Sequence, residues 1–255
     1  MKLEFTDNLA WLYTGDATKL DDIRDRTIDC VFIDPPYGIN YVTGHRKVSL
    51  HSAVRTNERF KEIANDKEFP TKMLVDCLWE LYRVMKPESA IYVCTRWDVQ
   101  NQVMALMEDL FQIRNCITWV KNNWTAGDLE GNYGYQTEMI IYATKGDHKL
   151  LGKRGTNAWF FKRVEGKQLL HPAQKPVPLV QYAISKSCPE GGVVLDCFAG
   201  SCSTVVAAHQ MGRYSVGVDL DPENIKIGIG RLQTVELITE DVSMPEQSNF
   251  QPSFI

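Results

Sequence analysis

Short apolar runs alternate with amphipathic stretches along most of this chain. The apolar runs predict strands at 10–13, 28–33, 90–94, 116–120, 137–143, 193–196 and 214–219. Apolar residues at helical spacing predict helices at 17–24, 71–85, 97–111, 177–185, 203–210 and 222–232. Strands that alternate with helices in this way are typical of an α/β fold with a mostly parallel central sheet and helices on both faces.

The segments between these elements differ in character. Residues 39–69 are polar and irregular, and a loop of that length in a compact domain is usually functional or mobile. Residues 122–136 and 144–176 are weakly periodic and rich in Gly, Lys and Asn. Residues 233–255 contain acidic side chains but no Lys or Arg, which favours a loose acidic tail. We therefore expect a single domain over residues 1–232, followed by that tail.

Composition narrows the class of protein. The chain has 255 residues, of which 44% are hydrophobic and 24% charged, as in soluble globular domains. Its net charge of −4 excludes a general polycation, so binding to nucleic acid would need local basic patches. No apolar run reaches the roughly 20 residues that cross a bilayer, and the N-terminal residues lack the apolar core of a signal peptide. We therefore expect a cytoplasmic protein.

The seven cysteines point to no special chemistry. Their number is odd and no pair has C-x-x-C spacing. Several lie in apolar runs, which favours reduced, mostly buried thiols over disulfides or a zinc site. No metal is expected.

A strand, a tight turn of small residues and a helix start follow one another at 193–204. Such a turn lets a ligand approach backbone N–H groups at the start of a helix. The turn is not G-x-G-x-x-G, and its Asp and aromatic residue do not suit a dinucleotide pyrophosphate. From this segment alone, any Rossmann-like nucleotide site is the alternative. The candidate cofactor-binding residues here are Asp196, Cys197, Phe198, Ala199, Gly200, Ser201, Ser203 and Thr204.

An acidic residue ends the next predicted strand. Asp219 follows the turn by about twenty residues, where an acidic side chain commonly accepts hydrogen bonds from ribose hydroxyls. With its neighbour Leu220, it extends the candidate cofactor site.

The sequence Asp34-Pro35-Pro36-Tyr37 ends another buried strand, where open α/β sheets bind their ligands. One substrate whose chemistry suits these residue types is the exocyclic amine of a nucleobase. Such an amine is a poor nucleophile because its lone pair is delocalised into the ring. Two acceptors, the Asp34 carboxylate and the Pro35 carbonyl, would favour a more tetrahedral nitrogen. Tyr37 offers a face on which a base extruded from the duplex could stack. The alternative for this motif by itself is a strand that ends in a proline turn.

Together these motifs resemble the β group of amino-directed DNA methyltransferases. The turn reads D-x-F-x-G-S-x-S-T, a strand ending in Asp follows it, and the D-P-P-Y motif precedes both, which is the circularly permuted order of that group. The resemblance covers about residues 10–232. It implies a Rossmann-like methyltransferase fold that binds S-adenosyl-L-methionine, with Asp34 near both cofactor and base. It also implies a catalytic half at about 10–121, a variable DNA-recognition segment at about 123–170 and a cofactor half at about 171–232.

Further segments match the same family. Leu12 to Asp16 resembles its "GD" motif, whose Asp lies near the cofactor's adenine. Trp119-Val120-Lys121 resembles the "WxK" strand beside the target-base pocket. The segment 171–176 matches H-P-x-Q-K-P, which implies that His171 and Lys175 help to close that pocket and bind the cofactor. One departure is Cys202, which stands where the family usually has Gly, so a side chain there could narrow the turn.

The resemblance implies a site-specific DNA methyltransferase that acts on the N6 amine of adenine in a flipped-out base. The alternatives are cytosine N4, an amine in RNA or protein, and a DNA-binding homologue with impaired cofactor binding. The implied partner is double-stranded DNA, with no membrane, while a homodimer and a functionally linked restriction endonuclease are left open.

Two basic segments, residues 45–61 and residues 145–167, are candidates for phosphate contacts. Solvated loop charge is the alternative for each side chain, and the aromatic residues at 124, 133, 135, 159 and 160 could be base wedges or local core. The candidate DNA-binding residues are Arg46, Lys47, Arg55, Arg59, Lys121, Lys153 and Arg154.

Overall fold

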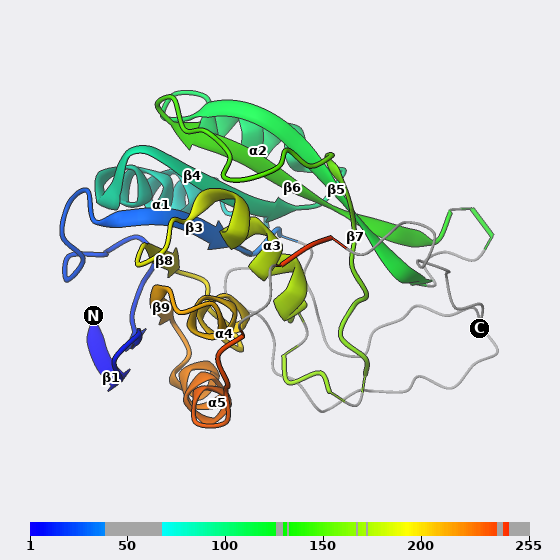
Figure 1. The fold of residues 1–255 in the computed structure, drawn as a ribbon. Helices are drawn as coiled ribbons and strands as arrows, with labels where there is room; N and C mark the ends of the chain where they lie inside the picture. The colour runs from blue at the N-terminus through cyan, green and yellow to red at the C-terminus, as the bar shows by residue number, and fades with distance from the viewer. Residues whose placement is uncertain are drawn as a thin grey trace.

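The computed structural model describes residues 1–38, 68–125, 130–131, 133–166, 168–171, 173–238 and 242–244. Within these residues, nine strands form one sheet in the order β1-β2-β9-β8-β3-β4-β6-β5-β7. The strands are β1 (Lys2–Thr6), β2 (Ala10–Thr14), β3 (Ile28–Ile33), β4 (Met85–Thr95), β5 (Gln112–Thr125), β6 (Tyr135–Lys145), β7 (Ala158–Phe160), β8 (Val193–Asp196) and β9 (Tyr214–Asp219). The helices are α1 (Thr71–Val84), α2 (Gln100–Met107), α3 (Val177–Ser187), α4 (Ser203–Gln210) and α5 (Pro222–Leu232) (Figure 1).

The centre of the sheet is parallel, and its strands end at one common edge. β2 pairs with β9, β9 with β8, β8 with β3, and β3 with β4, all in parallel. The chain leaves β3 for β4 on one side and leaves β8 for β9 on the other side. Ligands of open α/β sheets bind beyond the carboxyl ends of the strands at such a switch point. The crevice between β3 and β8 is therefore where a site is expected.

Antiparallel strands extend the sheet on both sides of this centre. β6 pairs with both β4 and β5 in antiparallel register, and β1 pairs with β2 in the same way. Because β6 runs against β4, its first residues lie at the edge where β4 ends: Met139 pairs with Thr95. The expected mostly parallel sheet is confirmed at the centre, and the wing formed by β6, β5 and β7 adds to it.

Helices cover both faces of the sheet, as the sequence predicts (Figure 1). On one face, Leu81 of α1 and Met107 of α2 pack in the same apolar cluster as Ile33 and Leu195. On the other face, α3 packs against a cluster that includes Phe32. α4 and α5 lie on that second face, where they bury apolar side chains beside β2. Burial on both faces explains why β3 from Cys30 to Ile33 and β8 from Val193 to Leu195 are runs of apolar residues.

The predicted helix at 17–24 is wrong, although its apolar residues are buried. The segment makes isolated turns, and its backbone is satisfied by α1 rather than by a helix of its own. The Leu20 N–H donates to Glu80 Oε2 at 2.9 Å. The Arg83 guanidinium donates to the carbonyl oxygens of Leu20 and Ile23, each at 3.0 Å. Tertiary hydrogen bonds therefore replace the helical ones, which a local sequence pattern cannot show.

Other differences concern the ends of elements. α1 ends at Val84, and β4 begins at Met85 without a loop, so the predicted boundary at 85–90 is wrong. α2 is shorter than the predicted 97–111, and β5 is longer than the predicted 116–120. The sequence missed β1 and β7, which are short strands at the two edges of the sheet. Edge strands bury less apolar surface, so their apolar pattern is weaker.

The thiols are free, as predicted, and all but Cys116 are buried. Among the described residues, no group of His, Cys, Asp and Glu side chains is placed to hold a metal ion. None of the helices that the structure describes is both long and apolar enough to span a membrane.

Candidate functional site

Three carboxylates meet at the carboxyl edge of the parallel strands. Asp34 follows β3, Asp196 is the last residue of β8 and Asp219 is the last residue of β9. β3 pairs with β8 and β8 with β9, so the three side chains lie at neighbouring strand ends. A cavity lined by Asp34 and Asp196, but not by Asp219, opens at the switch point of the sheet. Its lining residues are Phe32, Asp34, His171, Ala173, Gln174, Lys175, Asp196, Phe198, Ala199, Gly200, Ser201, Ser203 and Thr204.

Asp34 is held by a partner on each of its carboxylate oxygens. The Tyr37 hydroxyl donates to Oδ1, and the Lys175 ammonium forms an ion pair with Oδ2. Each carboxylate oxygen has a second lone pair, so Asp34 can accept further hydrogen bonds while it keeps both partners. Burial raises the pKa of Asp34 to about 6, although the charge of Lys175 acts against this rise. The group is therefore an acceptor-only carboxylate at neutral pH.

Lys175 belongs to a row of four alternating charges. Its ammonium lies 3.4 Å from Glu138 Oε2, and Lys121 lies 2.6 Å from Glu138 Oε1. Burial alone would raise the pKa of Glu138, but the charges of Lys175 and Lys121 outweigh it and lower that pKa to about 2. Burial alone would lower the pKa of Lys175, but Asp34 and Glu138 raise it above its ordinary value. Asp34, Glu138 and Lys175 are therefore charged at neutral pH.

Glu138 is a site residue that the sequence reasoning missed. It lies near the start of β6, opposite Trp119 of β5. The one signal was a lone carboxylate beside the apolar run Met139 to Ala143 in a predicted strand. Lys121 was predicted to contact DNA, but its side chain is buried and paired with Glu138. The structure therefore places Lys121 inside the charge row rather than on an exposed basic face.

The predicted cofactor turn follows β8 and reaches across to the end of β9. The N–H of Phe198 donates to Asp196 Oδ1 at 3.0 Å, and the N–H of Gly200 donates to Asp219 Oδ2 at 2.7 Å. Gly200 has φ +49°, a left-handed conformation in which a side chain is disfavoured. A Cβ on Gly200 would also approach the His171 ring to 3.5 Å. The turn thus fits closely between β9 and the 171–175 segment.

Asp219 is oriented by three donors. Besides Gly200, the N–H of Asp221 and the amide of Asn224 donate to its Oδ1, at 2.9 and 3.0 Å. Gly15, which follows β2, also donates its N–H to the Asp219 carbonyl at 2.9 Å. This contact places the neighbouring Asp16 near the same strand end, where its exposed side chain accepts from Thr18. Leu220 is 56% exposed, so its side chain is available to a ligand.

Asp196 has no ion-pair partner among the residues that the structure describes. It is 5% exposed and lines the cavity. Burial raises its pKa to about 7, while a hydrogen bond from Thr204 and one from the Phe198 N–H act against this rise. An unpaired buried carboxylate is costly, and a cationic ligand would remove that cost. Burial also lowers the pKa of His171, so its ring is neutral at pH 7.

The sequence suggested that a side chain at Cys202 could narrow the cofactor turn. The structure shows that this side chain points away from the cavity and does not narrow it. Cys202 precedes α4 with φ 59° and ψ 34°, and it is fully buried without lining the cavity. Its side chain points at Gly228 of α5: a Cβ on Gly228 would lie 2.2 Å from the Cys202 sulfur. Because residue 228 is glycine, there is space beside α5 for the Cys202 side chain.

Arg231, on the same helix as Gly228, braces the turn from outside the cavity. Its Nη1 donates to the Ser201 carbonyl at 2.5 Å and to Ser203 Oγ at 3.1 Å. Nothing in the local sequence signals this contact, because Arg231 lies about thirty residues after the turn.

The residues present fit S-adenosylmethionine. That cofactor carries an ammonium group, a carboxylate, a ribose and a positively charged sulfur. Asp196 is an unpaired buried carboxylate suited to the ammonium group, and Asp219 is an oriented acceptor suited to the ribose hydroxyls. The hydroxyls of Ser201, Ser203 and Thr204 line the cavity and can donate to a carboxylate. The three acidic side chains together favour a ligand with positive charge.

The predicted DNA contacts are only partly described. Arg46, Lys47, Arg55 and Arg59 lie outside the described residues. Lys153 and Arg154 are exposed on the segment that precedes β7. Of the aromatic residues left open as wedges or core, Trp159 is buried and belongs to the core. Trp124, Tyr133 and Tyr135 are exposed, and Phe160 is half-buried.

Comparison with known proteins finds similarity to DNA methyltransferases. Residues 28–229 match the family model described as DNA methylase, of the N6/N4 group. The type II methyltransferase M2.DpnII of Streptococcus pneumoniae is 31% identical over 84% of this chain and 85% of its own length. DNA adenine methyltransferase YhdJ of Escherichia coli is 28% identical over 86% of this chain and 81% of its own length.

Solved structures share the fold at lower identity. The M1.HpyAVI–SAM complex is 18% identical, with a TM-score of 0.66 over 88% of this chain and all of that one. The cytosine-N4-specific PvuII DNA methyltransferase is 16% identical, with a TM-score of 0.68 over 89% of this chain and 87% of that one. The fold is therefore shared with a cytosine-N4-specific enzyme and does not by itself indicate adenine.

Proposed function

This chain belongs to the family of adenine-N6 and cytosine-N4 DNA methylases, and we propose that it transfers a methyl group from S-adenosylmethionine to the N6 amine of adenine in double-stranded DNA. The observation that carries the proposal is the position of Asp34. Its carboxylate, which is 13% exposed, lines the same cavity as the cofactor turn, one strand away from Asp196. An acceptor for the amine and a site for the methyl donor thus share one space.

Asp34 acts as a hydrogen-bond acceptor for the target amine, not as a nucleophile. Its carboxylate accepts from one N–H of the base, and the backbone carbonyl of Pro35 accepts from the other. Both bonds draw the nitrogen lone pair out of conjugation with the ring. Lys175 and Tyr37 hold the two carboxylate oxygens in place, so little reorganisation is needed when the base arrives.

The base must leave the duplex, because its amine is not accessible within the helical stack. Tyr37 follows the two prolines and provides the ring against which the extruded base stacks, while its hydroxyl stays with Asp34. Pro36 and the buried Pro35 fix the backbone between Asp34 and that ring. These residues would hold the amine toward the cofactor's methyl group, and such positioning supplies much of the rate.

The cofactor supplies an electrophilic methyl group on a positively charged sulfur. Asp196 would hold its ammonium group, the serine and threonine hydroxyls of the turn would hold its carboxylate, and Asp219 would hold its ribose. Asp16 and Leu220, which lie beside Asp219, would border its adenine. His171, Lys175 and the backbone of Cys197 to Gly200 would close the cavity around its methionine end.

We also propose the permuted arrangement of the β group. β3 with its D-P-P-Y motif precedes β8 and the cofactor turn along the chain, yet β3 and β8 are neighbours in the sheet. The division into a catalytic half, a recognition segment and a cofactor half follows from this order. A homodimer and a linked restriction endonuclease stay predictions.

Adenine is favoured over cytosine by the Asp that begins the motif and by the relative YhdJ, which is named as an adenine methyltransferase. Cys202 was the one feature that pointed to an impaired homologue, and its side chain lies outside the cavity. The test is to incubate the protein with labelled cofactor and unmethylated duplex DNA, and then to digest the DNA and identify the labelled nucleoside. N6-methyladenine supports the proposal. N4-methylcytosine alone would refute the adenine assignment, and label on RNA in a matched incubation but not on DNA would refute DNA as substrate.

A further inference from the structure

A second cavity, of about 560 Å³, lies on the α3 face of the sheet and away from the catalytic edge. Its floor includes Asn115 of β5 and Tyr142 of β6, which pair with each other in the sheet. Lys186 at the end of α3 lines it, whereas Lys175 of the catalytic site precedes the start of that helix. The two cavities share no lining residue. Its volume is within the range of small-ligand sites.

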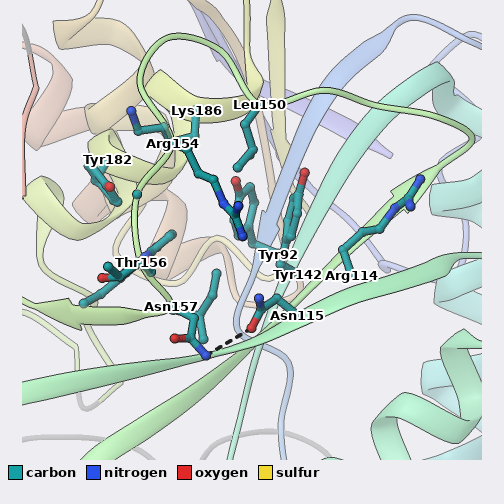
Figure 2. Close-up of a pocket in the computed structure, with 13 residues that line it drawn as sticks. Tyr92, Arg114, Asn115, Tyr142, Leu150, Arg154, Thr156, Asn157, Tyr182 and Lys186 are labelled. Carbon is teal, nitrogen blue, oxygen red and sulfur yellow. Dashed lines mark hydrogen bonds between the residues drawn. The ribbon is translucent and has the colours of Figure 1, made fainter.

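The charged side chains that line this second cavity are all positive: Arg114, Arg154 and Lys186. Lys186 donates to the Lys153 carbonyl at 2.8 Å, and Arg114 donates to Thr144 Oγ1 at 3.1 Å. Arg154 makes no hydrogen bond or ion pair with any residue that the structure describes. Figure 2 shows its side chain extended into the cavity toward Tyr92. A free guanidinium that faces a cavity lined by no acidic side chain is suited to an anionic group.

Neutral polar groups complete the lining. Asn157 donates to Asn115 Oδ1 at 3.2 Å (Figure 2). This bond leaves the Asn115 amide nitrogen as a donor and the Asn157 carbonyl oxygen as an acceptor, at the two outer ends of the bonded pair (Figure 2). A nucleobase edge carries donors and acceptors that either group can meet. Tyr142 and Tyr182 also line this cavity.

The segment over the cavity is fitted closely to α3. A Cβ on Gly155 would lie 2.1 Å from the Tyr182 hydroxyl, so only glycine permits this approach. The preceding residue is Arg154, and its position over the cavity is thus fixed by the packing of its neighbour. The segment that carries Arg154 is therefore packed against α3.

We infer that this cavity binds a nucleotide, with its phosphate on Arg154 and its base held by the remaining donor of Asn115 or the remaining acceptor of Asn157. The guanidinium matches a phosphate, each amide can bond to a base edge, and the volume accommodates one nucleotide. The nucleotide is either free in solution or part of a DNA strand that continues past the catalytic edge. The inference rests on this cavity alone and does not depend on the methyl-transfer chemistry.

The test uses the whole protein with S-adenosylhomocysteine present in excess, so that the cofactor pocket is occupied, and binding at the target-base site is recognised because Arg154→Ala leaves it unchanged. Calorimetry compares the four deoxynucleoside 5′-monophosphates with the matching nucleosides, and then a single-stranded oligonucleotide. The variants are Arg154→Ala and Asn115→Ala, and the control is Lys149→Ala, which removes an exposed cation of the same segment that does not line the cavity.

We expect at least one monophosphate, or the oligonucleotide, to bind tenfold more tightly than its nucleoside. Arg154→Ala and Asn115→Ala should each weaken this binding about tenfold, and Lys149→Ala should change it less than twofold. Binding of the monophosphate identifies a free nucleotide as the source, and binding of the oligonucleotide alone identifies a strand. The inference is overturned if neither probe binds, or if Lys149→Ala weakens binding as much as Arg154→Ala does.

Discussion

The Lys175 ammonium is ion-paired with Asp34 and is itself held by Glu138. The pair joins the segment before α3 to the end of β3, which are 141 residues apart in the chain. Its effect on Asp34 is electrostatic: the positive charge opposes the rise in pKa that burial causes. The ionisation of the proposed amine acceptor therefore depends on a residue from the other half of the fold.

Methyl transfer should increase with pH through about 6. Asp34 accepts the amine protons only as a carboxylate, and its pKa is raised to about 6, so the active form is lost as the pH falls below that value. Lys175→Met removes the nearest positive charge, which should raise the pKa of Asp34 and move the midpoint to higher pH. Single-turnover rates at saturating cofactor, from pH 5 to 8.5, measure this midpoint. Lys72→Met, which alters an exposed cation on α1, should leave it unchanged.

Glu138→Gln should move the same midpoint in the opposite direction. The negative charge of Glu138 raises the pKa of Asp34, so its removal lowers that pKa and extends activity to lower pH. The variant also leaves Lys121 and Lys175 with a neutral partner, and we expect it to lose roughly 1–3 kcal/mol of stability. Glu236→Gln changes an exposed carboxylate and is the matched control. If Glu138→Gln and Lys175→Met moved the midpoint in the same direction, the charge row would not set the pKa of Asp34.

Cofactor affinity should depend on the ionisation of Asp196 rather than on that of Asp34. Burial raises the pKa of Asp196 to about 7, and its carboxylate is the form that binds the cofactor's ammonium group. Affinity should therefore weaken as the pH falls from 8 to 6, and Asp196→Asn should bind weakly with little dependence on pH. Calorimetry with S-adenosylmethionine over this range measures both effects. An equally steep dependence in Asp196→Asn would assign the titration to another group.

Cys202 and Gly228 should be strongly coupled in stability. A Cβ on Gly228 would meet the Cys202 sulfur at 2.2 Å, so Gly228→Ala should lose about 1–3 kcal/mol through overpacking. Adding Cys202→Gly should restore most of that loss, because the new methyl group then occupies the vacated space. Urea denaturation of the four proteins gives a coupling energy, expected to be at least about 1 kcal/mol.

The control for this cycle lies two residues along the same helix. Gly230 has open space where its Cβ would be, so Gly230→Ala should stabilise α5 by roughly 0.5–1 kcal/mol. Equal losses from Gly228→Ala with and without Cys202 would show that the two residues do not compete for space.

The sequence predicts the parts of this fold that depend on local pattern. β3 and β8 have the predicted bounds because they are buried on both faces, and α5 begins at a proline as expected. The sequence could also predict that Asp34, Asp196 and Asp219 lie near one another, since parallel strands direct their carboxyl ends to one edge.

What the sequence could not predict depends on contacts between distant segments. Glu138 reaches the site only because β6 is inserted between β4 and β5, out of chain order. The 17–24 segment has helical spacing, but Glu80 and Arg83 take its backbone hydrogen bonds. The volume of Cys202 could be foreseen, whereas its direction is set by a left-handed backbone and by the space at Gly228.

The most direct measurement for the central claim is single-turnover methyl transfer to duplex DNA by Asp34→Asn, with cofactor affinity and melting temperature measured on the same preparation. The substitution keeps the shape of the side chain and removes its charge. The predicted result is a loss of at least about 100-fold in the rate of N6-methyladenine formation, with S-adenosylmethionine bound within a few-fold of the unaltered protein. A variant that stays folded, binds the cofactor and transfers methyl groups at the unaltered rate would contradict the account.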